Sequence, residues 1–167
     1  PQTCPRLRLV VLALYAWDEA RHLASLGGPL EEQRRAREAL TEIESLGVHP
    51  DLALDAEYAA TAVRAALAAA QDERPEMELL LTHARDLAER LARRESRPLW
   101  PRSFNLLAGE LWFEVDRYAE SRAAFERAVA NGPSPLAQVG LARALAREGQ
   151  PKDACTIYRQ VTSAAPA

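Results

Sequence analysis

The chain has 167 residues, of which 27% are charged, and a formal net charge of -3 at neutral pH. Ala, Leu, Arg and Glu are abundant, Val, Ile and Thr are sparse and aromatic residues make up 6%, so the composition predicts an all-α fold rather than a sheet. The length fits one domain, and the small negative charge excludes a global field of the kind that attracts nucleic acid or an anionic membrane.

Glycine and proline divide the chain into eight predicted helices, each with apolar residues at helical spacing. The first contains the apolar run Leu9–Trp17, which is shorter than the about 20 residues of a transmembrane helix. We expect this helix to be buried inside the monomer, with a contact between two copies of the chain as the alternative, and we expect no transmembrane segment. The first four helices are predicted over residues 5–26, 29–46, from after 51 to about 72, and from about 75 to just before 97.

The segment Arg97–Pro101 is predicted to be a stiff connector, because its two prolines exclude a continuous helix. Short loops make neighbouring helices antiparallel, so eight such helices form either a closed bundle or a stack of hairpins. An internal repeat favours the stack. The last four helices are predicted over residues 102–115, 118–130, 135–148 and 151–163.

The last third of the chain repeats itself with a constant offset of 33 residues. Gly109 and Ala142 are small, so the paired helix of each hairpin can approach closely, whereas Phe125 and Tyr158 are predicted to pack toward the following repeat. The matched pairs are Gly109 with Ala142, Trp112 with Leu145, Ser121 with Ala154, Phe125 with Tyr158, Ala128 with Val161 and Pro133 with Pro166.

This pattern resembles the tetratricopeptide repeat (TPR), a helix-turn-helix unit of about 34 residues. The resemblance covers residues 102–166 as two repeats and implies a right-handed TPR-like α-solenoid of stacked hairpins. Residues 1–97 are interpreted as divergent hairpins with longer helices, so that 1–167 is one helical-repeat domain; a separate four-helix bundle docked onto two repeats is the alternative. The motif residues are Gly109, Tyr118, Phe125, Ala128 and Pro133, then Leu141, Ala142, Gly149, Ala154, Tyr158 and Pro166.

The resemblance further implies a concave face, lined by the first helix of each hairpin, that holds a partner peptide or helix. The chain has one lysine, Lys152, at the start of its last helix, so a lysine-based clamp for a chaperone C-terminus is not expected. A partner-binding groove is predicted at Ser103, Leu106, Glu110, Phe113 and Glu114 of the fifth helix and at Leu136, Val139, Arg143, Ala146 and Arg147 of the seventh.

Four charged residues of this groove follow the repeat. Glu110 and Glu114 are four residues apart on one helix, as are Arg143 and Arg147 on the next groove-lining helix. The offset of 33 residues pairs Glu110 with Arg143 and Glu114 with Arg147. The pattern predicts two ion pairs between repeats; a zwitterionic groove that reads a charged peptide is the sharper alternative.

Residues that would carry chemistry are sparse. No glycine-rich phosphate loop occurs, and the three histidines have no metal-ligand spacing, so we expect no catalytic residue, cofactor or metal. Cys155 is predicted to be a buried thiol, and no disulfide with the distant Cys4 is expected. The arginines of residues 85–102 alternate with Asp86, Glu89 and Glu95, as on a solvated helix face, so no nucleic acid partner is expected.

The sequence therefore predicts a non-catalytic adaptor or scaffold for another protein, of bacterial origin because arginine greatly outnumbers lysine. The alternative is a regulatory or sensory domain cut from a larger enzyme or transcription regulator. Self-association is a further possibility, through the first helix or through an uncapped flank of the last. Because the sequence begins at Pro1 rather than at methionine, it leaves the compartment open between the cytoplasm and the periplasm or exterior.

Overall fold

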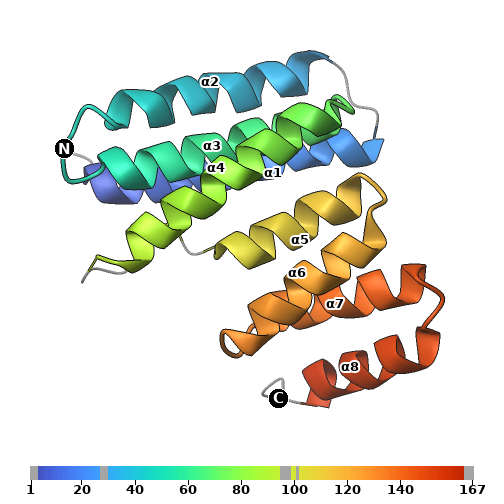
Figure 1. The fold of residues 1–167 in the computed structure, drawn as a ribbon. Helices are drawn as coiled ribbons and strands as arrows, with labels where there is room; N and C mark the ends of the chain where they lie inside the picture. Colours follow the sequence, from blue (N-terminus) through green and yellow to red (C-terminus); the bar gives the residue numbers. More distant parts are fainter. Residues whose placement is uncertain (1–3, 27–29, 95–98, 101, 164–167) are drawn as a thin grey trace. The chain divides into compact units, whose positions relative to one another are not determined.

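The computed structural model describes residues 4–26, 30–94, 99–100 and 102–163. These contain eight α-helices and no strand, as the composition predicts (Figure 1). The chain forms two compact units, Pro1–Pro101 and Arg102–Ala167. The helices are α1 (Pro5–Leu26), α2 (Leu30–Leu46), α3 (Ala53–Ala70), α4 (Arg74–Ala92), α5 (Phe104–Glu114), α6 (Tyr118–Ala130), α7 (Pro135–Arg147) and α8 (Pro151–Ser163).

The predicted helices and the observed ones agree to within about two residues, with one larger difference. Helix α4 ends at Ala92 with Arg93 as its C-cap, short of the predicted end before Arg97, because the apolar spacing stops at Leu91. The predicted stops at Gly27, Gly28 and Pro166, and most of the predicted connector, lie outside the described residues.

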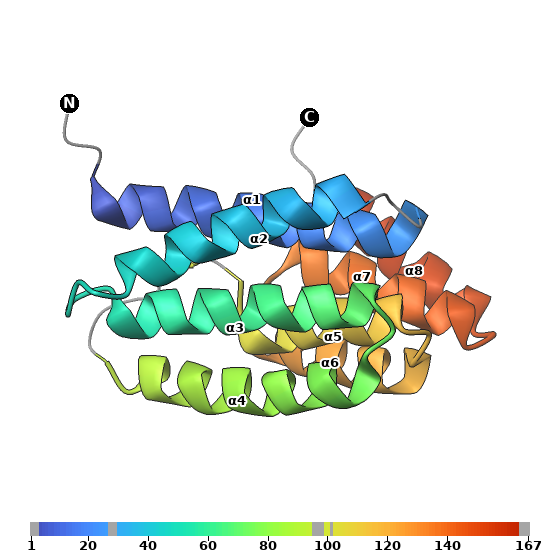
Figure 2. The ribbon, with the colours of Figure 1, turned by 90° about the horizontal axis from the view of Figure 1, so that it is seen from above.

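In the first unit, α3 is the central helix and packs against α1, α2 and α4. Figure 2 shows α3 and α4 side by side as one hairpin, next to the hairpin of α1 and α2. Helix α3 is rich in alanine and buried on almost every side. The small side chains let three helices approach its backbone, whereas α2 and α4 each bury one apolar stripe.

Trp100, from the connector, is buried against the helices of this unit. Its ring makes edge-to-face contacts with Trp17 of α1, at 5.6 Å between centroids, and with Tyr58 of α3, at 5.7 Å. Next to it, the backbone N–H of Leu99 donates a 2.8 Å hydrogen bond to the buried carboxylate of Asp55. The described part of the connector is therefore held by an aromatic cluster and by one buried acid.

In the second unit, each helix packs against the next, and α5 also contacts α7. Figure 1 shows α5 to α8 following one another in chain order. The ring of Phe125 on α6 lies between two glycines, Gly109 of α5 and Gly140 of α7. A Cβ atom at Gly109 would stand 2.7 Å from this ring, and one at Gly140 would stand closer still. Phe125 thus packs toward the following hairpin, as predicted, and requires a glycine on both sides.

The hydroxyl of Ser121, on the same helix, is fully buried and donates a 2.8 Å hydrogen bond to the carbonyl oxygen of Gly109. The predicted role of these two small residues in the close approach of α5 and α6 is confirmed. In the last hairpin, Ala142, Leu145 and Ala154 form the equivalent buried cluster. The two hairpins therefore use the same positions for their internal contacts.

The turn inside a hairpin has the same geometry in α3–α4, α5–α6 and α7–α8. Each turn has a residue with positive φ two residues after the helix: Asp72 at 56°, Asp116 at 60° and Gly149 at 79°. The backbone N–H that follows it donates a 2.9 Å hydrogen bond to a carbonyl five residues earlier, which is a Schellman motif. These bonds run from Glu73 to Ala68, from Arg117 to Trp112 and from Gln150 to Leu145.

This shared turn extends the repeat into the first unit, where the sequence shows no constant offset. The turns at Asp72 and Asp116 lie 44 residues apart, and this offset places Ala65 on Gly109, Leu81 on Phe125 and Ala84 on Ala128. All three residues of the α3–α4 hairpin are buried. Small residues thus again match small ones and a large one matches a large one.

Helix α1 differs from the prediction. One side is buried as expected, through residues such as Leu9, Ala13 and Trp17. The opposite side is exposed: Leu7 is 63% accessible, Val11 56% and Tyr15 43%. The apolar run fills two faces of the helix, and only one of them has a neighbour in its unit.

Cys155 is also exposed, together with Cys4, so the predicted buried thiol is wrong. The reason is its position on α8, where Ala154 is the one fully buried side chain among the described residues. No helix within the described ranges has the length and hydropathy needed to span a membrane.

Candidate protein-binding surface

The predicted binding residues of α7 form one stripe along the helix. Leu136, Val139, Arg143 and Arg147 are spaced i, i+3, i+7 and i+11, which places them on one face. Leu136 is 61% accessible, Val139 is half-buried and both arginines are exposed. Helix α7 therefore presents an apolar first half and a cationic second half; Ala146 beside them is exposed as well.

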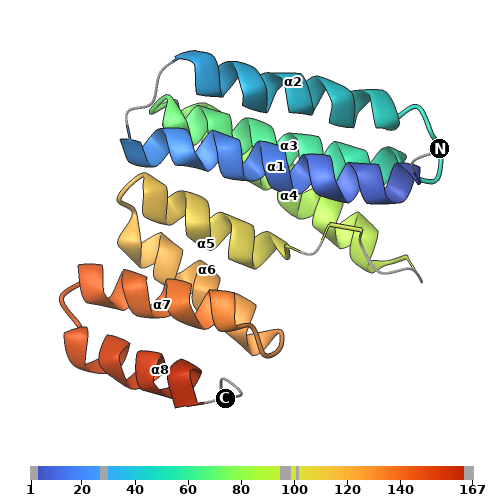
Figure 3. The same ribbon diagram turned by 180° about the vertical axis from the view of Figure 1, so that it is seen from behind.

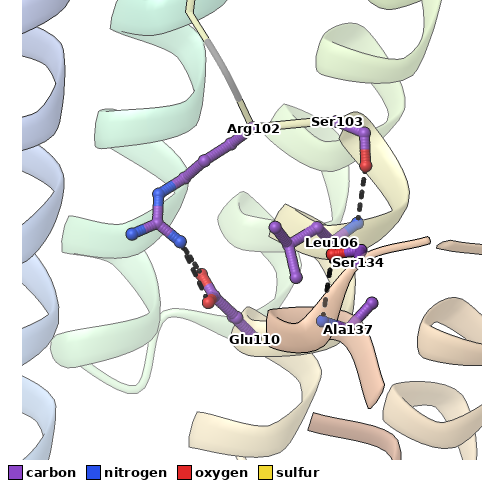
Figure 4. Close-up of polar contacts among 6 residues, drawn as sticks. All are labelled: Arg102, Ser103, Leu106, Glu110, Ser134 and Ala137. Carbon is purple, nitrogen blue, oxygen red and sulfur yellow. Dashed lines mark hydrogen bonds and ion pairs between the residues drawn. The ribbon is translucent and has the colours of Figure 1, made fainter. Parts of the chain in front are cut away.

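The stripe predicted on α5 has a different environment. Ser103 is the N-cap of the helix, and its hydroxyl oxygen accepts a 3.4 Å hydrogen bond from the N–H of Leu106 (Figure 4). Ser134 caps α7 in the same way, accepting from the N–H of Ala137 at 3.2 Å. Serine is a favoured N-cap because its oxygen satisfies a backbone donor of the first turn. Ser103 thus has a structural role besides its place at the surface.

Leu106 requires a correction. It is only 6% accessible and belongs to a core cluster with Phe125, Ala128, Ala137 and Ala144. The helical spacing places Leu106 on the same line as Glu110, but α6 and α7 close over this part of the line. A partner therefore has no access to its side chain, and Leu106 is a core residue.

Glu110 forms an ion pair with Arg102, from the residues just before α5. One guanidinium nitrogen of Arg102 lies 3.0 Å from each carboxylate oxygen (Figure 4). The two side chains are only 15% and 14% accessible. Sequence spacing predicts Arg143 as the partner of Glu110; the ion pair that the structure shows is with Arg102, whose charge largely neutralises that of Glu110.

Arg143 and Arg147 lie over aromatic rings of the preceding hairpin. The guanidinium of Arg143 is 4.3 Å from the ring centroid of Phe113, and that of Arg147 is 4.9 Å from the ring centroid of Tyr118. The two rings contact each other edge to face at 5.4 Å. Each arrangement is a cation–π interaction, which restrains an arginine while leaving its charge available to solvent.

Arg147 has two further partners at the turn between α5 and α6. It donates a 2.5 Å hydrogen bond to the hydroxyl of Tyr118 and lies 3.8 Å from the carboxylate of Asp116. Tyr118 in turn donates a hydrogen bond to Asp116. The hydrogen bond with Tyr118 raises the pKa of Arg147 above its ordinary value, so the guanidinium stays charged. Sequence reasoning did not select Tyr118 or Asp116; their 33-residue relation to the α7–α8 turn was the available signal.

The sequence-predicted residues thus divide into two groups. Phe113, Leu136, Val139, Arg143 and Arg147 form what we call the α5–α7 surface. Leu106 lies in the core, Ser103 caps a helix and Glu110 is paired internally. Glu114 is half-buried on α5, and its predicted pairing with Arg147 stays a prediction.

The arginines near the end of α4 form ion pairs of mixed partners. Arg94 lies 3.6 Å from Asp55, Arg90 4.0 Å from Glu57 and Arg93 3.9 Å from Glu89. His83 lies 3.3 Å from Glu57 as well. This face is a network of both charge signs, as predicted from the sequence.

Two other searches of the described residues give no stronger candidate site. No group of three or more His, Cys, Asp or Glu side chains is placed to hold a metal ion in the part of the chain that is described. A surface hollow of about 390 Å³ lies on α2, lined by Gln33, Arg34, Arg37, Glu38 and Thr41. Its lining comes from one exposed helix face with no buried polar group, so it offers no built binding site.

Comparison with known proteins gives no match to a protein-family model, to a curated protein or to a solved structure. The function of the chain is therefore argued from its own residues. The α5–α7 surface is the described region where exposed apolar and restrained charged side chains occur together.

Proposed function

We propose that the chain is a non-catalytic, TPR-like interaction module that binds a segment of another protein on the α5–α7 surface. The observation that carries the proposal is the pair Arg143 and Arg147, each held over an aromatic ring of the preceding hairpin and each exposed. The same role fits a stand-alone adaptor and a regulatory domain of a larger protein.

The arrangement of the two arginines lowers the cost of binding. A free arginine side chain loses rotamer freedom when a ligand immobilises it, at about 0.5–1.5 kcal/mol per residue. Arg143 and Arg147 are already restrained by Phe113 and Tyr118. Aromatic and arginine side chains are also the residue types enriched in protein interfaces and in their energetic centres.

The apolar half of the surface provides an anchor next to these charges. Leu136 is 61% accessible at the start of α7, and Val139 lies one turn further along the same stripe. An isolated exposed leucine has no special meaning, but one on the same face as two restrained arginines extends a single contact surface. A helix or extended segment running along α7 would meet the apolar residues first and the arginines second.

The charge of the surface indicates the chemistry of the partner. Glu110 is paired with Arg102 and only 14% accessible, which leaves Arg143 and Arg147 as the fully exposed charges of the stripe. Guanidinium groups pair with carboxylates through two parallel hydrogen bonds. We therefore propose a partner segment that carries an apolar anchor followed by one or two acidic residues.

The repeated turn supports the TPR-like part of the proposal. Three hairpins share the same turn and the same order of small and large buried residues, at offsets of 44 and 33 residues. Repeats of this kind build extended surfaces for other proteins rather than enclosed sites for catalysis. This step from repeat to interaction module is an analogy between folds.

The proposal is tested by selecting peptides from a random displayed library on the full chain. The selected peptides are then titrated against the wild type and an Arg143→Glu/Arg147→Glu variant. We expect acidic residues among the selected peptides and at least about a tenfold loss of affinity for the variant, because each like-charge contact costs more than 1 kcal/mol. An Arg159→Glu variant is the matched control, since it reverses an exposed arginine on α8.

Two results decide against the proposal. One is a selected peptide that binds the double variant and the wild type equally, because the arginines then play no part in recognition. The other is a peptide whose binding is lost equally in the Arg159→Glu control. A reciprocal Glu→Lys change in the peptide that restores binding to the double variant would locate the contact on the surface.

A further inference from the structure

We infer that two copies of this chain associate through the exposed side of α1, with the two helices antiparallel and the symmetry axis at Val11. This surface belongs to the first unit and is independent of the proposed peptide-binding surface. The exposed residues Leu7, Val11 and Tyr15 are spaced i, i+4 and i+8, so they form one stripe along the helix. Figure 3 shows α1 in front of α3, with one side uncovered by the helices of its unit.

The stripe is more apolar than the exposed side of an ordinary surface helix. Each of its three residues is more than 40% accessible, and Leu14 and Leu12 beside it are half-buried. The opposite side of α1 already supplies the core contacts, through Leu9, Ala13 and Trp17. A helix whose two sides are both apolar is buried on both sides in the working protein.

The stripe is complementary to a second copy of itself in the antiparallel direction. With the axis at Val11, Leu7 of one copy faces Tyr15 of the other, and Val11 faces Val11, because each pair has the same mean position along the helix. Leucine against tyrosine is a common apolar pair on helices. The same residues contact each other twice, once on each side of the axis, as in an isologous dimer.

The charges on this side of α1 also favour the antiparallel direction. Arg8 is exposed toward the N-terminal end of the stripe, and Asp18 is exposed at its C-terminal end, with Glu19 next to it. An antiparallel pair brings Arg8 of one copy toward Tyr15, Asp18 and Glu19 of the other. A parallel pair brings Arg8 next to Arg8 and Asp18 next to Asp18, so like charges meet at both ends.

The native cysteine reports on the direction. Cys4 is exposed just before α1, seven residues from Val11. At 1.5 Å rise per residue, the two Cys4 residues of an antiparallel pair would lie about 21 Å apart, too far for a disulfide, which needs Cα atoms within about 7 Å. In a parallel pair the two would be adjacent.

The first test measures the mass of the full chain in solution by sedimentation equilibrium over a range of concentrations. We expect the wild type to approach the dimer mass reversibly and a Val11→Glu variant to stay monomeric, because two carboxylates would face each other at the axis. A Leu79→Glu variant is the matched control, since Leu79 is an equally exposed apolar residue on α4, at 65%; it should associate like the wild type. Circular dichroism confirms that both variants fold.

The second test uses oxidation to form disulfides. In a Cys4→Ser/Cys155→Ser background, a Val11→Cys variant is expected to cross-link, whereas Cys4 in the wild type is not. A monomeric wild type overturns the proposal, and so does a Val11→Glu variant with the wild-type mass. Efficient cross-linking through Cys4 would overturn the antiparallel direction.

Discussion

The ring of Phe125 fills the space that a side chain at Gly140 would occupy, and it joins one hairpin of the second unit to the next. The same ring covers Gly109 within its own hairpin. One aromatic residue therefore controls the spacing of α5, α6 and α7.

Gly140→Ala is expected to destabilise the protein by about 1–2 kcal/mol, although alanine is normally the better helix former by about 1 kcal/mol. The added methyl group has no space beside the Phe125 ring. Phe125→Leu alone is also destabilising, but it should partly rescue Gly140→Ala. The measurement is urea unfolding of the two single variants and the double variant. Strict additivity of the two free energy changes would show that the two residues do not share this contact.

Trp100 is the buried anchor of the connector next to the first unit. Trp100→Ala is expected to lower the free energy of unfolding by about 3–5 kcal/mol, as for other buried aromatic residues. Its indole N–H has no hydrogen-bond partner among the described residues, so Trp100→Phe loses packing but no hydrogen bond. We expect Trp100→Phe to cost clearly less than Trp100→Ala in thermal and urea unfolding. Equal losses would mean that the indole N–H has a partner in the folded protein.

The ion pair of Arg102 and Glu110 is expected to be more sensitive to the loss of one partner than of both. Glu110→Gln or Arg102→Met leaves one charge in a site of low accessibility and should cost about 3 kcal/mol. The double variant Arg102→Met/Glu110→Gln removes both charges and should cost less than the sum. Unfolding of all three variants by urea measures the coupling energy. A cost of less than about 1 kcal/mol for each single variant would show that water screens the pair.

Tyr58 makes the stability of the first unit depend on alkaline pH. Burial raises the pKa of Tyr58 above its ordinary value, so the folded protein keeps the phenol proton at a pH where the unfolded chain releases it. The stabilisation is complete below the unfolded pKa of about 10, and it is lost as pH rises above that value toward the folded pKa.

We expect the free energy of unfolding to fall above about pH 10, by up to about 1.4 kcal/mol per pH unit for this group. Tyr58→Phe should weaken this dependence, whereas Tyr15→Phe, at an exposed position, should not. Urea midpoints between neutral and alkaline pH measure the effect. An alkaline loss that is the same in Tyr58→Phe and in the wild type would assign it to other groups.

The helix boundaries were predictable because glycine and proline act locally. Pro135 and Pro151 begin their helices as predicted, and Gly149 ends a helix because it adopts positive φ more readily than other residues. The close approach at Gly109 and Ser121 was also predictable, since the 33-residue repeat aligns small residues with small ones.

The candidate surface was only partly predictable, because its contacts depend on which residues outside the repeat reach it. Arg102 lies before α5, and helical spacing does not show that its side chain reaches Glu110, eight residues later. The burial of Leu106 follows from the position of Phe125 and its neighbours on α6 and α7. For α1, hydrophobicity alone did not distinguish a second core face from an exposed one.

The turn that α3–α4, α5–α6 and α7–α8 share acts as a fixed reference point from which helix length is free to vary. Helix α3 has 18 residues, whereas α5 has 11 and α7 has 13, and α4 has 19 where α6 and α8 have 13. Because the turns coincide, the additional turns of α3 and α4 lie at the open end of their hairpin. Lengthening of a hairpin therefore leaves the buried small and large residues beside the turn in register, and insertions in such a chain should accumulate at that open end.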